Sequence, residues 1–330
     1  LSTSTIYKVS IDGSVKKWMD DGMYRTISFS PNGEYVMISQ INKPFSYLVT
    51  YSRFPTDTNI YTKDGDFVSN LQKVPLIEEL PTGFMSVRTG KRSFSWRPDK
   101  GASLTYVTAL DSGDPSKKVD FRDEVYELNY PFSGKGKFIL KTINRFSGID
   151  WGTKDMAIAY DTWWNTRNRK SYVFNPSNPN IKPKIISDRN YQDTYSDPGS
   201  FLRSRNEFNR SVLKMHYGNV FLRGQGFSPN GQFPFIDKVN TKTFEKTRVY
   251  QSSYTDKIES IIDYDPKKNQ LTVSIESPSE YPNYYTKKIK SGKLEKLTNL
   301  KNPFLELQNV KKEKITYLRN DGVELSGILY

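Results

Sequence analysis

Seven arginines beside aromatic residues carry the chemistry that this chain suggests most clearly, the binding of carboxylate groups. A guanidinium group holds a carboxylate through two parallel hydrogen bonds, a geometry that a lysine ammonium cannot reproduce. The seven fall in segments expected to be loops, and they are Arg88, Arg92, Arg97, Arg167, Arg169, Arg203 and Arg205. We predict substrate contact for the first five. For Arg97 the alternative is an ion pair with Asp99, Asp111 or Asp114.

Other site chemistries lack the residues that they need. The chain has no cysteine, which excludes disulfides and thiolate metal sites, and His216 is its one histidine. No EF-hand spacing occurs, and we expect 195–200 to form a turn closed by an aspartate side chain. The run 134–137 lacks the spacing of a phosphate-binding loop and is typical of a hairpin tip. We predict no metal and no cofactor.

The charge balance is strongly basic. The formal net charge is +13 and the predicted pI is 9.4, a balance compatible with nucleic acid, anionic membranes or acidic peptides. Five consecutive basic residues do not occur, and no RNA-recognition motif is present. No apolar run approaches the ~18 residues that span a bilayer. We therefore expect an acidic peptide or protein as partner, and neither nucleic acid nor membrane.

The elements that would position the arginines are predicted to be strands. Aromatic residues make up 14% of the chain, an enrichment that suits half-buried pleated surfaces. In the stretch 84–115, strands at 93–96 and 103–110 flank a turn at 97–101 in which Pro98 fixes φ and Gly101 gives freedom. Further along, Trp163 and Trp164 are adjacent, so at most one can face a given groove, and we expect burial between sheets.

The same pattern of strand, turn and strand recurs along the chain. It predicts strand pairs such as 25–29 with 34–40, outer strands at 46–51 and 58–62, and a last series between 258 and 299. Aromatic residues sit near equivalent points of the units, at Phe29, Phe94, Trp151 and Tyr264. The spacing is uneven, which indicates about five four-stranded blades of a partial β-propeller with inserted loops.

A sequence motif in the central stretch resembles that of a known family. Arg88-x-Gly90-x-Arg92-Ser93-x-x-Trp96-Arg97-x-Asp99, followed by Tyr106-Val107 and Asp111-x-Gly113-Asp114, is similar to the non-catalytic β-propeller of glutamyl endopeptidases in the prolyl oligopeptidase family of serine peptidases. Further segments that resemble the sequences of this family lie at 48–54, 147–160, 195–200 and 315–330. The resemblance covers most of the chain and places Arg88, Arg92 and Arg97 on family-like positions.

The resemblance implies a domain plan. Residues 1–299 would form propeller blades, with further blades upstream. Residues 300–330 would be a linker and the first hairpin, around Asn320-Asp321-Gly322, of an α/β-hydrolase domain that the chain does not include. The nearest approach to the nucleophile motif Gly-x-Ser-x-Gly is Gly226-Phe227-Ser228-Pro229-Asn230, which fits a hairpin turn better. We therefore predict no catalytic residue in this chain. The family also favours a periplasmic or secreted location.

Two functions follow as expectations. In the first, the chain gates access and helps to bind acidic oligopeptides for the missing Ser-His-Asp hydrolase domain of the same polypeptide, since the related enzymes prefer glutamate before the scissile bond. In the second, it is a stand-alone propeller that binds an acidic partner protein.

Overall fold

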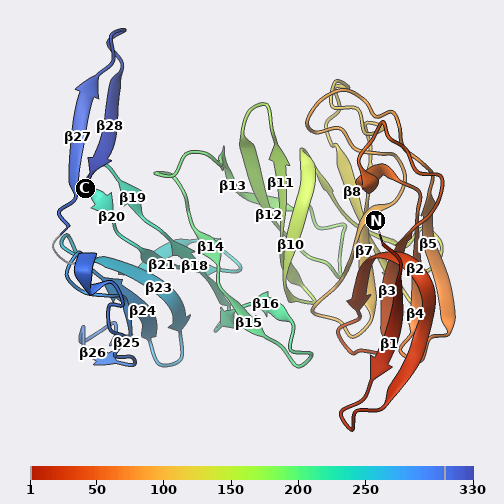
Figure 1. Ribbon diagram of the computed structural model, residues 1–330, viewed down its shortest axis with the longest axis horizontal. Helices are drawn as coiled ribbons and strands as arrows, with labels where there is room; N and C mark the ends of the chain where they lie inside the picture. The colour runs from red at the N-terminus through yellow and green to blue at the C-terminus, as the bar shows by residue number, and fades with distance from the viewer. Residues whose placement is uncertain (1, 308–309) are drawn as a thin grey trace. The chain divides into compact units, whose positions relative to one another are not determined.

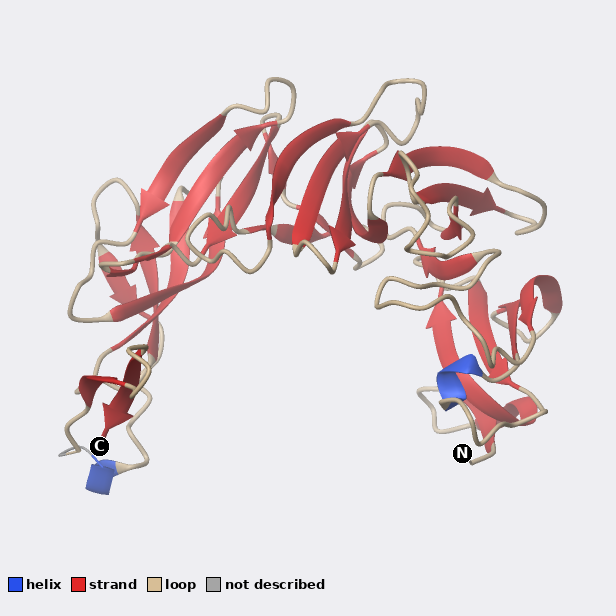
Figure 2. Cartoon of the chain, turned by 90° about the horizontal axis from the view of Figure 1, so that it is seen from above, coloured by secondary structure: helices blue, strands red, loops and turns tan. Residues whose placement is uncertain are grey.

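The computed structural model describes residues 2–307 and 310–330 and shows an all-β chain, as the sequence predicts. Figure 2 shows that strands and loops account for nearly all of it. Within the described residues the helical elements are two short 3₁₀ turns, η1 (Tyr51–Arg53) and η2 (Leu305–Leu307). None of the described helices is long and apolar enough to cross a membrane.

The chain divides into two compact units. Unit 1 comprises the described residues up to Ser196 together with Arg203–Val220 and Asn240–Phe244. Unit 2 comprises Asp197–Leu202, Phe221–Val239 and the described residues from Glu245 onward.

Unit 1 contains three large antiparallel sheets whose strands follow one another in sequence order, most of them labelled in Figure 1. The first sheet consists of β1 (Ser4–Val9), β2 (Val15–Phe29), β3 (Tyr35–Ile41), β4 (Thr56–Thr62) and β5 (Phe67–Val74). The second consists of β6 (Arg92–Trp96), β7 (Ser103–Ala109), β8 (Asp123–Asn129) and β9 (Lys137–Thr142). The third consists of β10 (Arg145–Thr153), β11 (Met156–Trp163), β12 (Asn168–Phe174) and β13 (Lys184–Asn190). This consecutive up-and-down order is that of propeller blades.

Two apolar clusters join these three sheets face to face. The first sheet packs on the second through buried side chains that include Met37, Ile60 and Trp96. The second packs on the third through a cluster that includes Val107 and Ala157. Burial of alternate strand residues on facing sheets is the expected driving force for such packing. Unit 1 also holds the hairpin of β15 (Arg203–Arg205) and β16 (Ser211–Leu213) and the short strand β17 (Met215–His216).

The remaining sheets have the same antiparallel organisation. The fourth large sheet has the order β14 (Ser200–Phe201), β18 (Asn219–Gly224), β21 (Phe235–Asn240) and β22 (Lys246–Gln251), with β17 pairing with β18. The fifth consists of β23 (Ile258–Asp265), β24 (Gln270–Glu276), β25 (Asn283–Lys288) and β26 (Leu294–Lys296). Side chains from both, among them Phe221, Ile236 and Leu271, form the core of unit 2.

Two small hairpins of unit 2 were predicted from the sequence. Strands β19 (Phe227–Ser228) and β20 (Gly231–Gln232) form a hairpin around Pro229 and Asn230, so the turn predicted there is confirmed. Strands β27 (Glu313–Leu318) and β28 (Glu324–Leu329) form the predicted C-terminal hairpin, closed by Arg319 N donating to Val323 O at 2.9 Å. Residues 308 and 309 of the predicted linker lie outside the described residues, and the boundary at 299 stays a prediction.

One predicted strand is wrong. Residues 46–50 form a loop that leads into η1, because β3 pairs directly with β4 from Tyr35 opposite Thr62 to Ile41 opposite Thr56. That ladder occupies the edge of β3 that a strand at 46–51 would need. Alternation in this stretch is short and lies between Pro44 and Pro55, so its apolar residues end up in an exposed loop. Tyr47 and Leu48 are both largely exposed there.

Candidate functional site: an arginine segment beside a pocket

The segment 83–92, called here the arginine segment, forms the last part of the connection from β5 to β6, includes the first residue of β6 and carries Arg88, Lys91 and Arg92. It has no regular structure before β6, so contacts with neighbouring loops fix its course. Val87 N donates to Gly113 O at 3.0 Å, Arg145 Nε donates to Met85 O at 2.8 Å, and Lys91 Nζ donates to Gly134 O at 2.6 Å. These bonds hold the segment against both the second and the third sheet, which prepares its side chains for binding without further ordering.

Gly113 permits this docking. Its φ is +78°, and a Cβ atom built on it would lie 1.8 Å from the carbonyl oxygen of Val87. No side chain other than hydrogen fits that approach, and the left-handed conformation favours glycine as well. Asp111 Oδ1 accepts a 3.0 Å hydrogen bond from Gly113 N, which closes the turn. The motif Asp111-x-Gly113 therefore has a structural role, to receive the arginine segment.

Asp111 is the first of two buried carboxylates under the segment. It accepts hydrogen bonds from Arg145 Nη1 and Nη2, both at 2.8 Å, and from Arg122 Nη1 at 2.7 Å. Burial by itself would raise the pKa of Asp111, but the hydrogen bonds from Arg145 and Arg122 outweigh it and hold that pKa below its ordinary value. Asp111 is thus an anion at neutral pH.

Asp123, the second buried carboxylate, connects the same network to Arg92. It lies 2.5 Å from Arg92 Nη2 and 3.2 Å from Arg145 Nη1, and it accepts a 2.8 Å hydrogen bond from Phe146 N. Three guanidinium groups, those of Arg92, Arg122 and Arg145, therefore surround two carboxylates. The cluster keeps an excess positive charge at the base of the arginine segment.

Arg88 adds a further charge, and no carboxylate of the described residues neutralises it. Its guanidinium is half-buried and donates to Gln72 Oε1 at 2.5 Å, to Thr89 O at 3.0 Å and to Lys91 O. Burial, and then repulsion from Arg92, lower the pKa of Arg88. Two neighbouring cations in a partly dry setting favour the arrival of an anion.

Unsatisfied donors lie at the same place. Among the residues that the structure describes, the buried side-chain atoms without a hydrogen-bond partner are Ser86 Oγ, Arg92 Nε and Arg92 Nη2. Arg92 Nη2 has its ion-pair contact with Asp123, but the geometry is outside that of a hydrogen bond. Two buried polar groups of the arginine segment, the Ser86 hydroxyl and Arg92 Nε, thus lack the partner that buried polar atoms normally have.

A pocket of about 440 Å³ opens beside Arg88. Its walls are residues 71–75, 77 and 79–81 on one side and 87–91 on the other, with Ser112. The volume lies in the range of ordinary ligand pockets. Among its lining residues are three cations, Lys73, Arg88 and Lys91, and one carboxylate, Glu79. The pocket is thus suited to an anionic group of modest size.

Arg97 lies elsewhere and is closed off from solvent. Its side chain is 1% exposed, donates to Asp99 at 3.1 and 2.6 Å and lies 3.1 Å from Glu127 Oε2. Its guanidinium also stacks on the ring of Trp151 at 3.9 Å. The pairing with Asp99 that the sequence offered as an alternative is therefore confirmed, and Arg97 joins the second sheet to the third.

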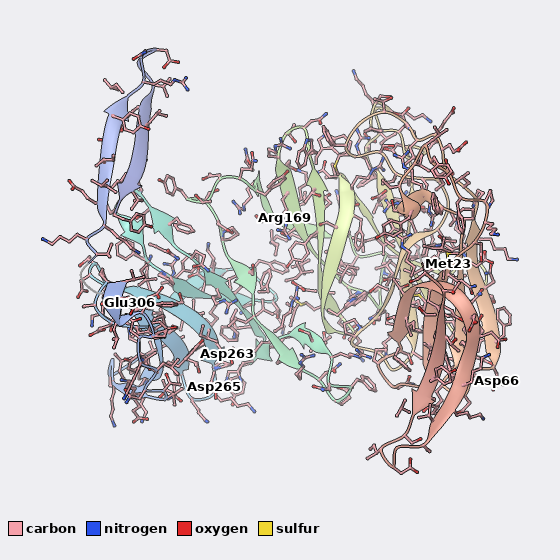
Figure 3. All side chains as sticks on the ribbon, viewed as in Figure 1. Met23, Asp66, Arg169, Asp263, Asp265 and Glu306 are labelled. Atoms are coloured by element: carbon pink, nitrogen blue, oxygen red, sulfur yellow. The ribbon has the colours of Figure 1, made fainter. Side chains whose placement is uncertain are left out.

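Arg167 and Arg169 rest on aromatic rings. Arg167 stacks on Trp164 at 3.8 Å and donates to Trp164 O at 2.9 Å, and Trp164 in turn contacts Phe84 of the arginine segment at 5.2 Å between ring centroids. Arg169, which is labelled in Figure 3, lies on β12 with its guanidinium 4.9 Å from the ring of Tyr160. Arg169 is a strand residue, although the sequence indicated a loop.

The structure thus brings Arg88 and Arg92 together, places Arg167 near the start of their segment and separates Arg97 from them. The predicted burial of both tryptophans is wrong for Trp164, which is 42% exposed because Phe84 and Arg167 cover it only in part. Trp163 is half-buried under Arg122 at 3.9 Å. The other two arginines lie on β15, where Arg203 pairs with Asp150 and Arg205 donates to Asn209 O at 3.0 Å.

Sequence reasoning missed part of the buried ion-pair network under this site. Asp123 and Arg145 were not singled out, because each looks like an ordinary charged residue at the start of a strand. The available signal was a charged residue at the end of an otherwise apolar strand.

No group of three potential metal ligands occurs among the described residues. Ser228 Oγ donates to Gly231 O at 3.0 Å within its hairpin.

Comparison with known proteins identifies two sequence relatives of this chain. The chain is 35% identical over 345 residues to a protein of Oryza sativa subsp. japonica named probable glutamyl endopeptidase, chloroplastic, and 32% identical over 346 residues to the Arabidopsis thaliana protein of that name. Both alignments include the whole of this chain. The resemblance to glutamyl endopeptidases is confirmed. The chain spans only 37% and 36% of the length of these two relatives.

Within this glutamyl endopeptidase-like chain, the sheets described above form a propeller region. No protein-family model matches the chain. Solved structures similar to it include the acylaminoacyl peptidase of Pyrococcus horikoshii, at 12% identity and a TM-score of 0.45 over 98% of this chain and 46% of that one. The β-propeller domain of the Trilobed protease from Pyrococcus furiosus is also similar, at 11% identity and a TM-score of 0.43 over 90% of this chain and 77% of that one. Neither score is high enough to assign a fold, which rests here on the sheets themselves.

Proposed function

We propose that this chain is the substrate-selecting propeller of a serine peptidase and that its arginine segment binds the side-chain carboxylate of acidic oligopeptides. The observation that carries the proposal is Arg88, a half-buried guanidinium at the pocket wall that has Arg92 beside it and no carboxylate partner in the described residues. A peptide carboxylate in the pocket would neutralise the charge of Arg88 and accept hydrogen bonds from its guanidinium. In this role the chain gates access to a separate hydrolase domain, which supplies the Ser, His and Asp.

The domain plan belongs to the same proposal. About five blades, ending near residue 299, would join further blades to complete the propeller, and 300–330 would lead into the hydrolase domain. The chain matches little more than a third of the length of each of the two relatives, which supports the proposal of a longer polypeptide.

Arg88 is the residue on which to test the proposal. In the full-length protein, Arg88→Gln should lower kcat/KM for glutamate-containing peptides at least about tenfold, the effect of losing one charge-assisted contact, and should leave neutral peptides nearly unchanged. Arg205→Gln, which alters an exposed arginine far along the sequence, is the matched control. Equal losses for acidic and neutral peptides would reject charge recognition.

Arg92 is a poorer test, although the sequence suggested it equally. Its substitution would leave the buried Asp123 with fewer cations, so stability and selectivity would change together. An acidic partner protein is the other candidate. It would bind the same segment, but Arg88→Gln would then alter binding of that partner and leave peptide hydrolysis unchanged.

A further inference from the structure

The pocket beside Arg88 runs along the free edge of β5. Strand β5 ends the first sheet and pairs only with β4 among the described residues, from Tyr61 opposite Phe67 to Thr56 opposite Val74. No main-chain hydrogen bond from another described segment reaches its outer edge at residues 71–74. An exposed edge of this kind presents a row of unpaired N–H and C=O groups.

The lining of the pocket shows that this edge faces it. Leu71, Gln72, Lys73 and Val74 all line the pocket, yet successive side chains of a strand point to opposite faces of the sheet. A pocket on one face would touch every second residue only. One that touches four in succession lies against the main-chain edge.

The dimensions and charges fit an extended peptide. Four strand residues span about 13 Å, enough for a short extended segment to pair with them. Segment 87–91 forms the opposite wall, and Arg88 reaches from it to Gln72, near the middle of the edge. Asn70 Nδ2 already donates to the Gln72 carbonyl at 3.3 Å, but a carbonyl has a second lone pair.

We infer that an acidic peptide binds here as an added β-strand, its main chain paired with residues 71–74 of β5 and a glutamate side chain near its middle held by Arg88. This inference rests on the proposed function and deepens it. Main-chain pairing supplies affinity without regard to sequence, and Arg88 selects for the acidic side chain. Glu79, which also lines the pocket, disfavours a peptide with carboxylates at every position, so a single central glutamate fits best.

The test uses main-chain methylation of the peptide. The full-length protein, treated with a fluorophosphonate to stop turnover by any serine nucleophile, is titrated into fluorescent blocked hexapeptides with one central glutamate, and affinity is read by polarisation. Each internal nitrogen is methylated in turn. Because every second residue of an added strand turns its N–H toward the edge, affinity should fall at least about tenfold at alternate positions and change little between them.

The outcomes separate the two proposals. Loss at alternate positions together with weaker binding to the Arg88→Gln protein supports both. A uniform effect of methylation, or none, overturns strand addition, and weaker binding to Arg88→Gln then still supports carboxylate recognition. Alternate losses with unchanged binding to Arg88→Gln overturn carboxylate recognition and leave strand addition standing. Failure of the parent peptide to bind at about 1 mM contradicts both.

Discussion

Arg145 holds Asp111 through two parallel hydrogen bonds of 2.8 Å, and this pair anchors the loop that presents Arg88. Asp111 side-chain exposure is 0% and that of Arg145 is 4%. Arg145 Nε also donates to Met85 O, so one guanidinium joins a buried carboxylate to the arginine segment. The site that we propose for substrate therefore depends on charges that substrate does not touch.

Removing Arg145 should destabilise unit 1 strongly. Arg145→Met leaves Asp111 and Asp123 with fewer cations in a buried setting, and loss of one partner of a buried pair costs about 3 to 5 kcal/mol. Urea unfolding followed by tryptophan fluorescence measures the change. Arg205→Met, at an exposed arginine, should cost no more than about 0.5 kcal/mol. Similar values for the two variants would show that the buried network contributes little.

Gly113→Ala should displace the arginine segment. The new methyl group would lie 1.8 Å from Val87 O, so the Val87–Gly113 hydrogen bond must open. Gly33→Ala is the matched control, because Gly33 has a similar φ of +75° and nothing within 4 Å of a built Cβ atom. Both substitutions carry backbone strain of about 1 to 2 kcal/mol, but only Gly113→Ala adds a clash. Limited proteolysis should cut within 83–92 faster in that variant, and equal rates would refute the docking role.

Low pH should reduce the free energy of unfolding partly through protonation of Asp111. Its pKa in the folded protein lies below the ordinary value of 3.8, so its ionised form contributes stability that is complete above 3.8 and is lost as pH falls toward the folded value. Asp111→Asn removes this contribution. The free-energy gap between wild type and variant should therefore shrink as pH falls below 3.8, measured by urea unfolding at several pH values. A gap that stays constant would contradict the shift.

Unit 2 contains a second buried ion pair that can be tested separately. Lys287 Nζ lies 2.9 Å from Glu259 Oε1, and Tyr250 donates to Glu259 Oε2 at 2.5 Å. Burial, and then the hydrogen bond to Glu259, raise the pKa of Tyr250 to about 12. Lys287→Met should cost about 3 to 5 kcal/mol because the carboxylate loses its cation.

Adding Glu259→Gln to Lys287→Met removes the unpaired charge and should recover part of that loss, as coupled neighbours do. Thermal unfolding of the single and double variants gives the coupling. Strictly additive effects would mean that the two groups do not interact.

The sequence predicted the local elements of this chain well. Pro98 and Gly101 fix a turn, and alternation on either side gives β6 and β7. It also placed Arg88 and Arg92 in one segment, because the three residues between them cannot separate them far. Strand 46–51 failed because local alternation does not show which strand takes the free edge of β3.

The ion-pair partners in the site could not be predicted from the sequence, because they come from residues far apart along the chain. Arg97 faces Glu127 of β8 and Trp151 of β10, and Asp111 faces Arg145, 34 residues away. Spacing along the chain does not reveal such partners, so a buried structural arginine and a substrate-binding one look alike in sequence. Only the ion pairs distinguish Arg97, which is neutralised, from Arg88, which has no carboxylate partner in the described residues.

The most direct test of the account is the coupling between Arg88 and the glutamate of a peptide. Affinities of the wild-type and Arg88→Gln proteins, both in full-length form, would be measured for two peptides that differ only by glutamate and glutamine. A close charge pair predicts a coupling energy of at least about 1.5 kcal/mol, so that glutamate is favoured about tenfold by the wild type and not by the variant. If both proteins discriminate between the peptides equally, Arg88 does not bind the carboxylate and the proposed function is wrong.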